Sequence, residues 1–336
     1  MKYTTLGKTG LNVSVVGLGG IPVQRTDKAE AVEIVNACME QGINYLDTAR
    51  GYTISEEYFG EAIKGNRDKW IIATKSMART YDAMKADIET SLKNLQTDYI
   101  DLYQIHNIKK EEDFETCFGE NGAYKALAEA KAAGKIRHIG ATAHGTDAFA
   151  RLIREYEDKI ETMMFPFNIV ESQGVELMKE CREKNIGFIA MKPMAGGNLD
   201  DTKLALRYIF NNPDCTIAIP GMGSAAEVLS NASDEVFQPL SDEDKETCAK
   251  ICKELGSQFC RRCEYCAPCP QGINIPANFL FVNYLRKYDL ADWARARYHS
   301  MPVTAKDCIG CGTCETRCPY ELPIREMLKK CAADMA

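Results

Sequence analysis

The hydrophobic positions in the first two thirds of the chain form short apolar runs, and these alternate with longer amphipathic stretches. Short apolar runs bounded by polar residues favour buried strands, and a helical spacing of apolar residues favours helices. Eight runs are predicted as strands: Val15–Gly19, Asn44–Asp47, Trp70–Lys75, Asp98–His106, Arg137–Thr142, Thr162–Phe167, Gly187–Lys192 and Thr216–Pro220. The segments between them are predicted as helices: Asp27–Gln41, Ser55–Lys64, Asp82–Leu95, Ala123–Ala133, Thr146–Tyr156, Val175–Lys184, Thr202–Asn211 and Ser224–Asn231.

Regular alternation of strands and helices predicts an α/β fold with a parallel sheet. Eight strand–helix units within about 220 residues are typical of a closed (β/α)8 TIM barrel. The opening segment Met1–Val13 has Gly7 and Gly10 between two extended pieces. We expect it to form a hairpin across the bottom of the barrel.

Cysteine density changes abruptly near residue 257, because eight of the fifteen cysteines lie in two C-terminal runs. The first run holds Cys260, Cys263, Cys266 and Cys269, and the second holds Cys308, Cys311, Cys314 and Cys318. The second run has the C-x2-C-x2-C-x3-C-P spacing of bacterial iron–sulfur proteins, in which the fourth cysteine ligates the other cluster. We therefore expect two [4Fe–4S] clusters, one on Cys260, Cys263, Cys266 and Cys318, the other on Cys308, Cys311, Cys314 and Cys269.

Two points about these cysteines stay open at this stage. The first run has two residues rather than three before its last cysteine, which leaves the crossover of Cys269 unsettled. Zinc also binds four-cysteine sets, although two runs that each end in Cys-Pro fit iron better. The remaining seven cysteines are scattered, and most are expected to be small core residues.

The C-terminal part reads as mainly α-helical. Residues 241–256 are predicted as a helix capped by Ser241, and further helices are predicted at Ile275–Lys287, Asp289–Tyr298 and Ile324–Ala333. We expect a barrel over residues 1–240 and a small dicluster ferredoxin-like domain, with its linker helix, over residues 241–336.

Composition narrows the classes of partner. The net charge of −7 argues against nucleic acid, since binding to phosphates favours a basic surface. No apolar run approaches the length of a membrane span, and Met1–Gly10 lacks the pattern of a signal peptide. We expect a cytoplasmic protein with no membrane contact and with reduced thiols.

Polar residues at the ends of neighbouring predicted strands form the candidate catalytic site. Asp47, Lys75 and His106 close three successive strands, and Tyr52 follows in the loop after Asp47. In this type of barrel the active site lies at the C-terminal ends of the strands. A tyrosine phenol has a pKa of about 10, and a nearby Lys75 ammonium would lower it. With Asp47 orienting the lysine and His106 bonded to a substrate oxygen, Tyr52 would serve as general acid or base.

These residues carry a family resemblance over roughly residues 1–235. Asp47-Thr-Ala-Arg-Gly-Tyr52 with Ser55-Glu56 resembles the D-T-A-x-x-Y…S-E signature of aldo-keto reductases. The family pattern also matches the segments that end in Lys75 and His106. It matches Ile219-Pro-Gly221 and Asn231 as well. The C-terminal part resembles the branch with a ferredoxin-like domain. The resemblance implies a catalytic tetrad of Asp47, Tyr52, Lys75 and His106, and an NADPH- or NADH-dependent carbonyl reductase or alcohol dehydrogenase.

The expected cofactor pocket departs from the family pattern. The family's Ser-Asn pair after strand five corresponds to Thr142 and Ala143, its glutamine to Met164, and its stacking tyrosine to Met191 or Lys192. In family members that use NADPH, a lysine and an arginine bind the 2′-phosphate. The corresponding positions here lie near Gly221 and Glu227, so the charge-assisted bonds to the phosphate are missing. We therefore expect NADH to be used at least as readily as NADPH. Glycine-rich turns still offer amides to a pyrophosphate. The candidate cofactor residues are Thr142, Lys192, Pro193, Met194, Gly196, Gly197, Gly221, Met222, Gly223, Ser224 and Asn231.

A nicotinamide and an iron–sulfur cluster cannot readily exchange electrons directly. The nicotinamide transfers two electrons as a hydride, whereas a [4Fe–4S] cluster transfers one electron at a time. Flavins bridge that mismatch. The chain is therefore read as an oxidoreductase for a small carbonyl or alcohol substrate, linked to an electron-relay domain and to a possible electron-transfer partner protein. One alternative is that the clusters are structural and stabilise the fold. The others are an electron-transfer enzyme whose barrel holds a flavin or another non-nicotinamide cofactor, an electron-transfer protein with the barrel as scaffold, and a non-redox lyase or isomerase. Arg50, Tyr81 and the loop 107–122 are expected to line the substrate pocket.

Overall fold

The protein is described by a computed structural model, which covers residues 1–256, 258–262, 266–318 and 320–336. It divides into two compact units. The first comprises Met1–Asn168, Ser172–Pro193 and Asp201–Leu240, and the second comprises Ile169–Glu171, Met194–Asp200 and Ser241–Ala336. Two short segments that leave the barrel strands therefore belong to the second unit.

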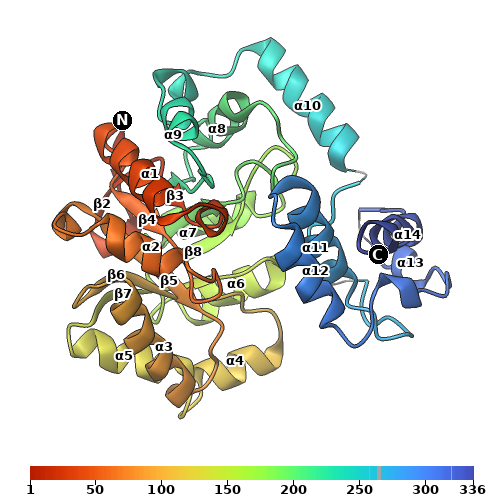
Figure 1. The fold of residues 1–336 in the computed structure, drawn as a ribbon, viewed down its shortest axis with the longest axis horizontal. Coiled ribbons are helices and arrows are strands. Elements are labelled where there is room, and N and C mark those ends of the chain that lie inside the picture. The colour runs from red at the N-terminus through yellow and green to blue at the C-terminus, as the bar shows by residue number, and fades with distance from the viewer. Residues whose placement is uncertain (257, 263–265, 319) are drawn as a thin grey trace. The chain divides into compact units, whose positions relative to one another are not determined.

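The first unit is built on one parallel sheet whose strands follow each other in chain order (Figure 1). The strands are β3 (Leu18–Gly19), β4 (Tyr45–Asp47), β5 (Ile71–Ser76), β6 (Ile100–Ile105), β7 (Ile136–Thr142), β8 (Thr162–Pro166), β9 (Gly187–Met191) and β10 (Ile217–Ala218). Parallel bridges Val16–Ala218 and Gly19–Gly221 join the first strand to the last. The predicted (β/α)8 barrel is confirmed.

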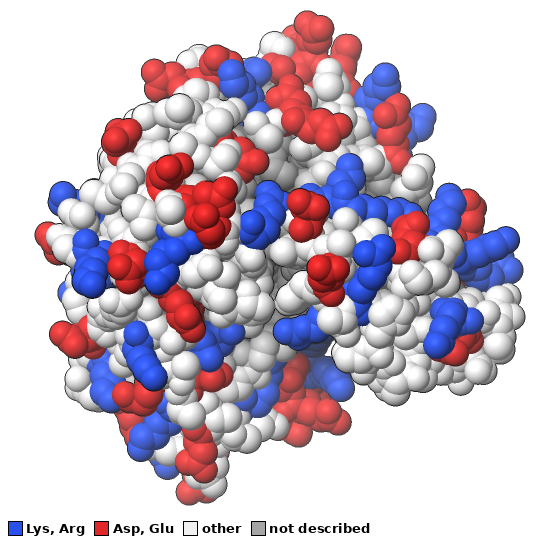
Figure 2. Space-filling model, viewed as in Figure 1, with Lys and Arg blue, Asp and Glu red and all other residues white. Residues whose placement is uncertain are grey.

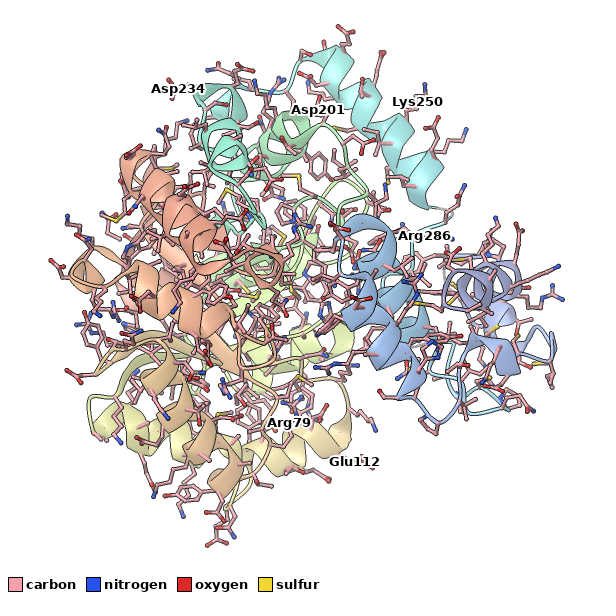
Figure 3. All side chains as sticks on the ribbon, viewed as in Figure 1. Arg79, Glu112, Asp201, Asp234, Lys250 and Arg286 are labelled. Atoms are coloured by element: carbon pink, nitrogen blue, oxygen red, sulfur yellow. The ribbon has the colours of Figure 1, made fainter. Side chains whose placement is uncertain are left out.

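Helices follow the strands and surround them (Figure 1). They are α1 (Lys28–Glu40), α2 (Ser55–Ala62), α3 (Tyr81–Asn94), α4 (Glu111–Phe118), α5 (Ala123–Ala132), α6 (Thr146–Glu155), α7 (Val175–Glu183), α8 (Thr202–Phe210) and α9 (Ala225–Asn231). Local capping explains where several of these helices begin. Asp27 and Glu30 form a reciprocal capping box at α1, and Asp201, labelled in Figure 3, accepts from the Leu204 amide at α8.

Helix α4 corrects the expectation of an open loop over residues 107–122. Three acidic residues, Glu111, Glu112 and Asp113, occupy its first turn, where they interact favourably with the helix dipole. The Asp113 carboxylate also accepts hydrogen bonds from the Lys109 and Lys110 amides at 2.9 and 3.2 Å. These bonds satisfy amides that the helix itself leaves unpaired.

The predicted N-terminal hairpin is confirmed by the antiparallel strands β1 (Tyr3–Thr5) and β2 (Asn12–Ser14). Leu6 and Val13 are fully buried, in one apolar cluster with Tyr45, Leu102 and other barrel residues. The hairpin thus covers one end of the barrel with apolar side chains. This leaves the carboxyl ends of the strands for the site.

The described part of the second unit is helical, as expected. Its elements are α10 (Asp242–Gly256), α11 (Ile275–Lys287), α12 (Ala291–His299), α13 (Thr313–Thr316) and α14 (Ile324–Asp334), with a short 3-10 turn at Ala305–Asp307. Asn278 is fully buried in its interior. The Asn278 side chain accepts from the Ala305 amide at 2.7 Å and donates to the Asn274 carbonyl at 2.8 Å. It therefore ties α11 to the chain just before the second cysteine run.

Of the scattered cysteines, most occupy core positions as predicted: Cys38, Cys117, Cys181, Cys248 and Cys331 are buried. Within the described residues, no helix is long and apolar enough to cross a bilayer. On the face drawn in Figure 2, basic and acidic side chains are intermixed.

Candidate functional site

The ends of β4 and β5 bring a buried ion pair together. Asp47 is the last residue of β4, and Lys75 lies one residue before the end of β5. The Lys75 ammonium donates to the Asp47 carboxylate and, at 2.8 Å, to the Thr48 carbonyl. Gln104 Nε2 on β6 donates to the other Asp47 oxygen at 3.4 Å. Both charged residues are 2% exposed, so this pair is held by neighbouring strands rather than by solvent.

Tyr52 lies beside this pair. The Lys75 Nζ is 4.8 Å from the centroid of the Tyr52 ring. The Tyr52 ring meets the His106 ring edge-on, with centroids 6.3 Å apart and an interplanar angle of 87°. The structure therefore brings all four sequence-predicted residues, Asp47, Tyr52, Lys75 and His106, into one cluster within the first unit.

Burial and charge both act on this cluster. Burial lowers the pKa of the Lys75 ammonium, and the Asp47 carboxylate acts in the opposite direction. Burial, followed by the cations Lys75, Arg79 and Lys192, holds the pKa of the His106 imidazole well below its usual value. The His106 ring is therefore neutral at neutral pH and can donate one hydrogen bond.

The segment after β6 is fixed by contacts to its backbone. Arg79 Nη2 donates to the carbonyls of His106 and Asn107 at 2.9 and 2.8 Å. Arg79 Nε donates to Asp113 on α4 at 3.0 Å (Figure 3 labels Arg79). Thr142, a predicted cofactor residue, uses its hydroxyl oxygen to accept from the Asn107 amide at 2.7 Å. These bonds leave little freedom for the backbone that carries His106.

A second buried carboxylate, which the sequence reading noted only as part of a signature, supports the Tyr52 loop. Glu56 is 1% exposed. It accepts from Arg50 Nη1 at 2.6 Å and from Thr74 and Ser91 hydroxyls at 2.8 Å each. The Arg50 guanidinium is thus bound to Glu56, and also to Asp87, rather than left free for a substrate. The other predicted pocket residue, Tyr81, begins α3 and donates to Glu129.

The loop after β10 holds several predicted cofactor residues. Gly221 bridges to Gly19, and Ser224 caps α9. The Gly223 amide donates to the Glu227 carboxylate at 2.6 Å. A Cβ at Gly223 would lie 3.1 Å from the Arg25 guanidinium, a cation that the sequence reading did not associate with this loop. Met222 and Asn231 are buried.

Some polar atoms of the first unit are buried without a hydrogen-bond partner within the described part of the chain. They include Gln104 Oε1 on β6, His106 Nδ1 just after β6 and Asn231 Oδ1 at the end of α9. Buried polar groups normally have partners.

The other predicted cofactor residues follow β9. Lys192 has φ = 57°, and its carbonyl accepts from Asn168 Nδ2 at 2.9 Å. Pro193 ends this segment of the first unit, whereas Met194, Gly196 and Gly197 belong to the second unit. There the Gly196 carbonyl accepts from Asn283 Nδ2 on α11 at 2.8 Å.

In the second unit the cysteines border two small cavities. One is lined by Cys260, Cys266 and Cys318 together with Arg261, Phe279 and Tyr320. The other is lined by Cys269, Cys308, Cys311 and Cys314. Cys263 lies outside the described residues. Each cavity therefore combines cysteines of one run with the last cysteine of the other.

The described cysteines form no group of three or more with the geometry of a single-ion site. Thiolates spread around a cavity suit a ligand of several atoms, such as an iron–sulfur cluster. The donor set fits that group.

Two arginines inside the first cysteine run anchor it. Arg262 Nη2 pairs with the fully buried Glu171 at 3.2 Å. Arg261 donates to the Val170 carbonyl at 3.3 Å and lies over the Tyr320 ring at 3.9 Å. Sequence reasoning missed this role, although a pair of arginines between cysteines was a visible signal.

Fold and site together define an oxidoreductase of the (β/α)8-barrel class with an iron–sulfur module. The family model described as "Aldo/keto reductase family" matches residues 15–204, and the "4Fe-4S dicluster domain" model matches residues 259–323. The chain belongs to the aldo/keto reductase family and carries a C-terminal 4Fe-4S dicluster domain.

Curated relatives agree with this assignment. The chain is 33% identical over 220 residues to "Uncharacterized oxidoreductase YqkF" of Bacillus subtilis, covering 61% of this chain and 68% of that protein. It is 26% identical over 305 residues to "L-galactose dehydrogenase" of Arabidopsis thaliana, covering 75% and 93%.

Solved structures are also similar to this chain. The holo form of aldo-keto reductase AKR11C1 from Bacillus halodurans has a TM-score of 0.65 and 27% identity, over 75% of this chain and 96% of that chain. An aldo/keto reductase from Klebsiella pneumoniae, solved in complex with NADP and acetate, has a TM-score of 0.64 and 25% identity, over 75% and 95%.

Proposed function

We propose that the barrel interconverts a carbonyl compound and an alcohol, with Tyr52 as general acid in reduction and general base in oxidation. One observation carries this proposal: a lysine ammonium, fixed by Asp47 and the Thr48 carbonyl, lies 4.8 Å from the centre of the Tyr52 ring. A cation so close favours the phenolate form, which makes the phenol a better acid. Proton transfer from a positioned side chain contributes about 10²- to 10⁴-fold to a rate.

His106 has a different role in this proposal. Its lowered pKa keeps the ring neutral, so it acts as a hydrogen-bond donor to the substrate oxygen rather than as a proton source. Such a donor stabilises negative charge that develops on the oxygen during reduction. Tyr52 then delivers the proton to that oxygen.

A bound nicotinamide dinucleotide would supply the hydride in this chemistry. The residues fit such a cofactor: Gln104, His106 and Asn231 each present a buried polar atom without a partner in the described structure. Arg25, beside Gly223, supplies a cation near the turn that we assign to the cofactor phosphates. The family resemblance also assigns to it residues of the first unit after β7, β9 and β10, namely Thr142, Lys192, Pro193, Gly221, Met222 and Ser224.

We propose that NADH binds at least as tightly as NADPH. The Glu227 carboxylate accepts from the Gly223 amide in the turn before α9, and there it would repel the 2′-phosphate of NADPH. The Klebsiella pneumoniae relative was solved in complex with NADP.

Residues 241–336 are proposed as the cluster domain, with two [4Fe–4S] clusters. Cys260, Cys263, Cys266 and Cys318 would hold one, and Cys269, Cys308, Cys311 and Cys314 the other. The lining of the two cavities supports this crossover. Iron–sulfur centres carry single electrons, and we propose that this domain relays them to or from an external carrier.

The test uses anaerobically purified protein, a panel of aldehydes and ketones, and both reduced nicotinamides. Tyr52→Phe is expected to lower kcat at least about 100-fold, because the proton donor is removed. Tyr58→Phe, on the neighbouring helix α2, is the matched control and should retain the activity. Full turnover by Tyr52→Phe would refute the role of Tyr52.

A further inference from the structure

Among the described cysteines of the two proposed cluster sites, Cys311 is the exposed one. Cys266 and Cys314 are buried, and Cys260, Cys269, Cys308 and Cys318 are partly exposed. This inference rests on the proposed pair of clusters and concerns which of them exchanges electrons with the surroundings.

Side chains of the second unit pack around the described cysteines of the first cavity. Arg261 is only 7% exposed and donates to the carbonyls of Gly256 and Val170 at 3.0 and 3.3 Å. Its guanidinium stacks over Tyr320 at 3.9 Å, and Phe279 also lines this cavity.

The loop Cys308–Gly312 borders the second cavity and carries exposed residues. Ile309 is 65% exposed, which is the largest exposure among the large hydrophobic side chains of the described chain. A Cβ at Gly310 would have no neighbour within 4 Å. An exposed apolar side chain next to an exposed ligand suits contact with another molecule.

The charges around this loop are partly cancelled. Arg325, which also lines the second cavity, pairs with Glu315 at 2.8 Å. The Asp307 carboxylate accepts from the Thr304 amide at 2.8 Å, and the neighbouring Lys306 is exposed. Lys306 therefore presents a positive charge at the base of the loop, beside the negative charge of Asp307.

We propose that electrons enter and leave the protein through the Cys308–Gly312 loop, so that the site formed by Cys269, Cys308, Cys311 and Cys314 reacts with a small one-electron carrier. Electron transfer weakens steeply with distance, so a site with an exposed ligand can exchange electrons with a carrier in solution. In one event a single electron passes between the cluster and the carrier. No covalent bond forms or breaks, and no proton is transferred.

Small charged redox probes test this directly on the holoprotein. One electron passes from the reduced protein to ferricyanide, an anion, and one passes from reduced methyl viologen, a cation, to the oxidised protein. Ile309→Lys attracts the anion and repels the cation, and Ile309→Asp does the reverse. We expect rate changes of about threefold in opposite directions at low salt. These changes should shrink above about 0.1 M salt, where the screening length is about 10 Å.

Leu229, 53% exposed on α9 in the first unit, provides matched controls. Leu229→Lys and Leu229→Asp should leave both rates unchanged. If an Ile309 variant loses iron, Lys306→Glu gives an independent reading, with slower reduction of ferricyanide and faster oxidation of the viologen.

The outcomes separate the inference from the proposed function. About eight iron atoms per chain with unchanged rates in the Ile309 and Lys306 variants would overturn the inference alone. Wild-type protein without iron–sulfur clusters would overturn both the inference and the proposed cluster domain. Opposite rate changes for the two probes, confined to the Ile309 and Lys306 variants, would support the inference.

Discussion

The ammonium of Lys75 lies 4.8 Å from the centre of the Tyr52 ring, and both residues come from the carboxyl side of adjacent barrel strands. Lys75 cannot move away readily, because Asp47 and the Thr48 carbonyl hold its charge. The barrel thus fixes a cation beside the one phenol in this cluster, and the predictions below follow from that arrangement.

The Asp47–Lys75 pair should behave as a coupled unit in stability. Asp47→Asn and Lys75→Met are each expected to lower the free energy of unfolding by about 3–5 kcal/mol, since each leaves a buried charge uncompensated. The double variant should lose less than the sum, by about 1–3 kcal/mol. Denaturant unfolding of anaerobic protein, followed by circular dichroism, measures the cycle. Additive losses would mean that the two side chains are not paired in solution.

His106 should remain neutral in mildly acidic solution. Its pKa is held well below the ordinary value, whereas the unfolded chain binds that proton near pH 6.5. Below pH 6.5 the unfolded state therefore binds more protons, and this site makes the folded state less stable as pH falls. ¹⁵N chemical shifts of labelled histidine, assigned with His106→Gln, should show no titration of His106 between pH 8 and 5.5. A midpoint near 6.5 would contradict the proposed donor role.

Cofactor preference should depend on Glu227. Removing its charge in Glu227→Gln is expected to tighten NADPH binding several-fold, because a repulsion worth about 1 kcal/mol is lost, and to leave NADH binding nearly unchanged. Dissociation constants from fluorescence titration measure both. Strong selectivity of the wild-type protein for NADPH, or an equal effect of the substitution on both dinucleotides, would contradict this account.

The cysteine crossover can be read from iron content. Cys266→Ala combined with Cys318→Ala should retain about four iron atoms per chain, since both residues serve one cluster in the proposed arrangement. Cys314→Ala combined with Cys318→Ala should retain none, because each cluster then loses a ligand. The reverse result would assign each run its own cluster.

The pattern of apolar runs was sufficient to predict the barrel, because each strand is buried and each intervening helix shows one apolar face. Helix α4 was not predicted from this pattern, because only two of its residues, Phe114 and Cys117, are buried. Its start depends on the acidic first turn and on Asp113 bonding to the preceding amides. Such short helices carry little periodicity.

The candidate tetrad could be found from its positions at the strand ends, whereas its supports could not. Glu56 accepts from Arg50, Thr74 and Ser91, and those contacts join residues up to 35 positions apart. Likewise, Glu171 lies 91 residues before Arg262. Pairing of this kind depends on the folded chain and leaves no local spacing in the sequence.

The proposed hydride transfer at Tyr52 can be tested by following deuterium from the C4 position of a reduced nicotinamide in a single anaerobic turnover. The substrate is the carbonyl compound that wild-type protein reduces fastest, and the product is analysed by mass spectrometry. We predict deuterium on the carbinol carbon in wild-type protein, at a rate at least about 100-fold above that of Tyr52→Phe. Deuterium released to solvent, or equal transfer by Tyr52→Phe, would contradict it.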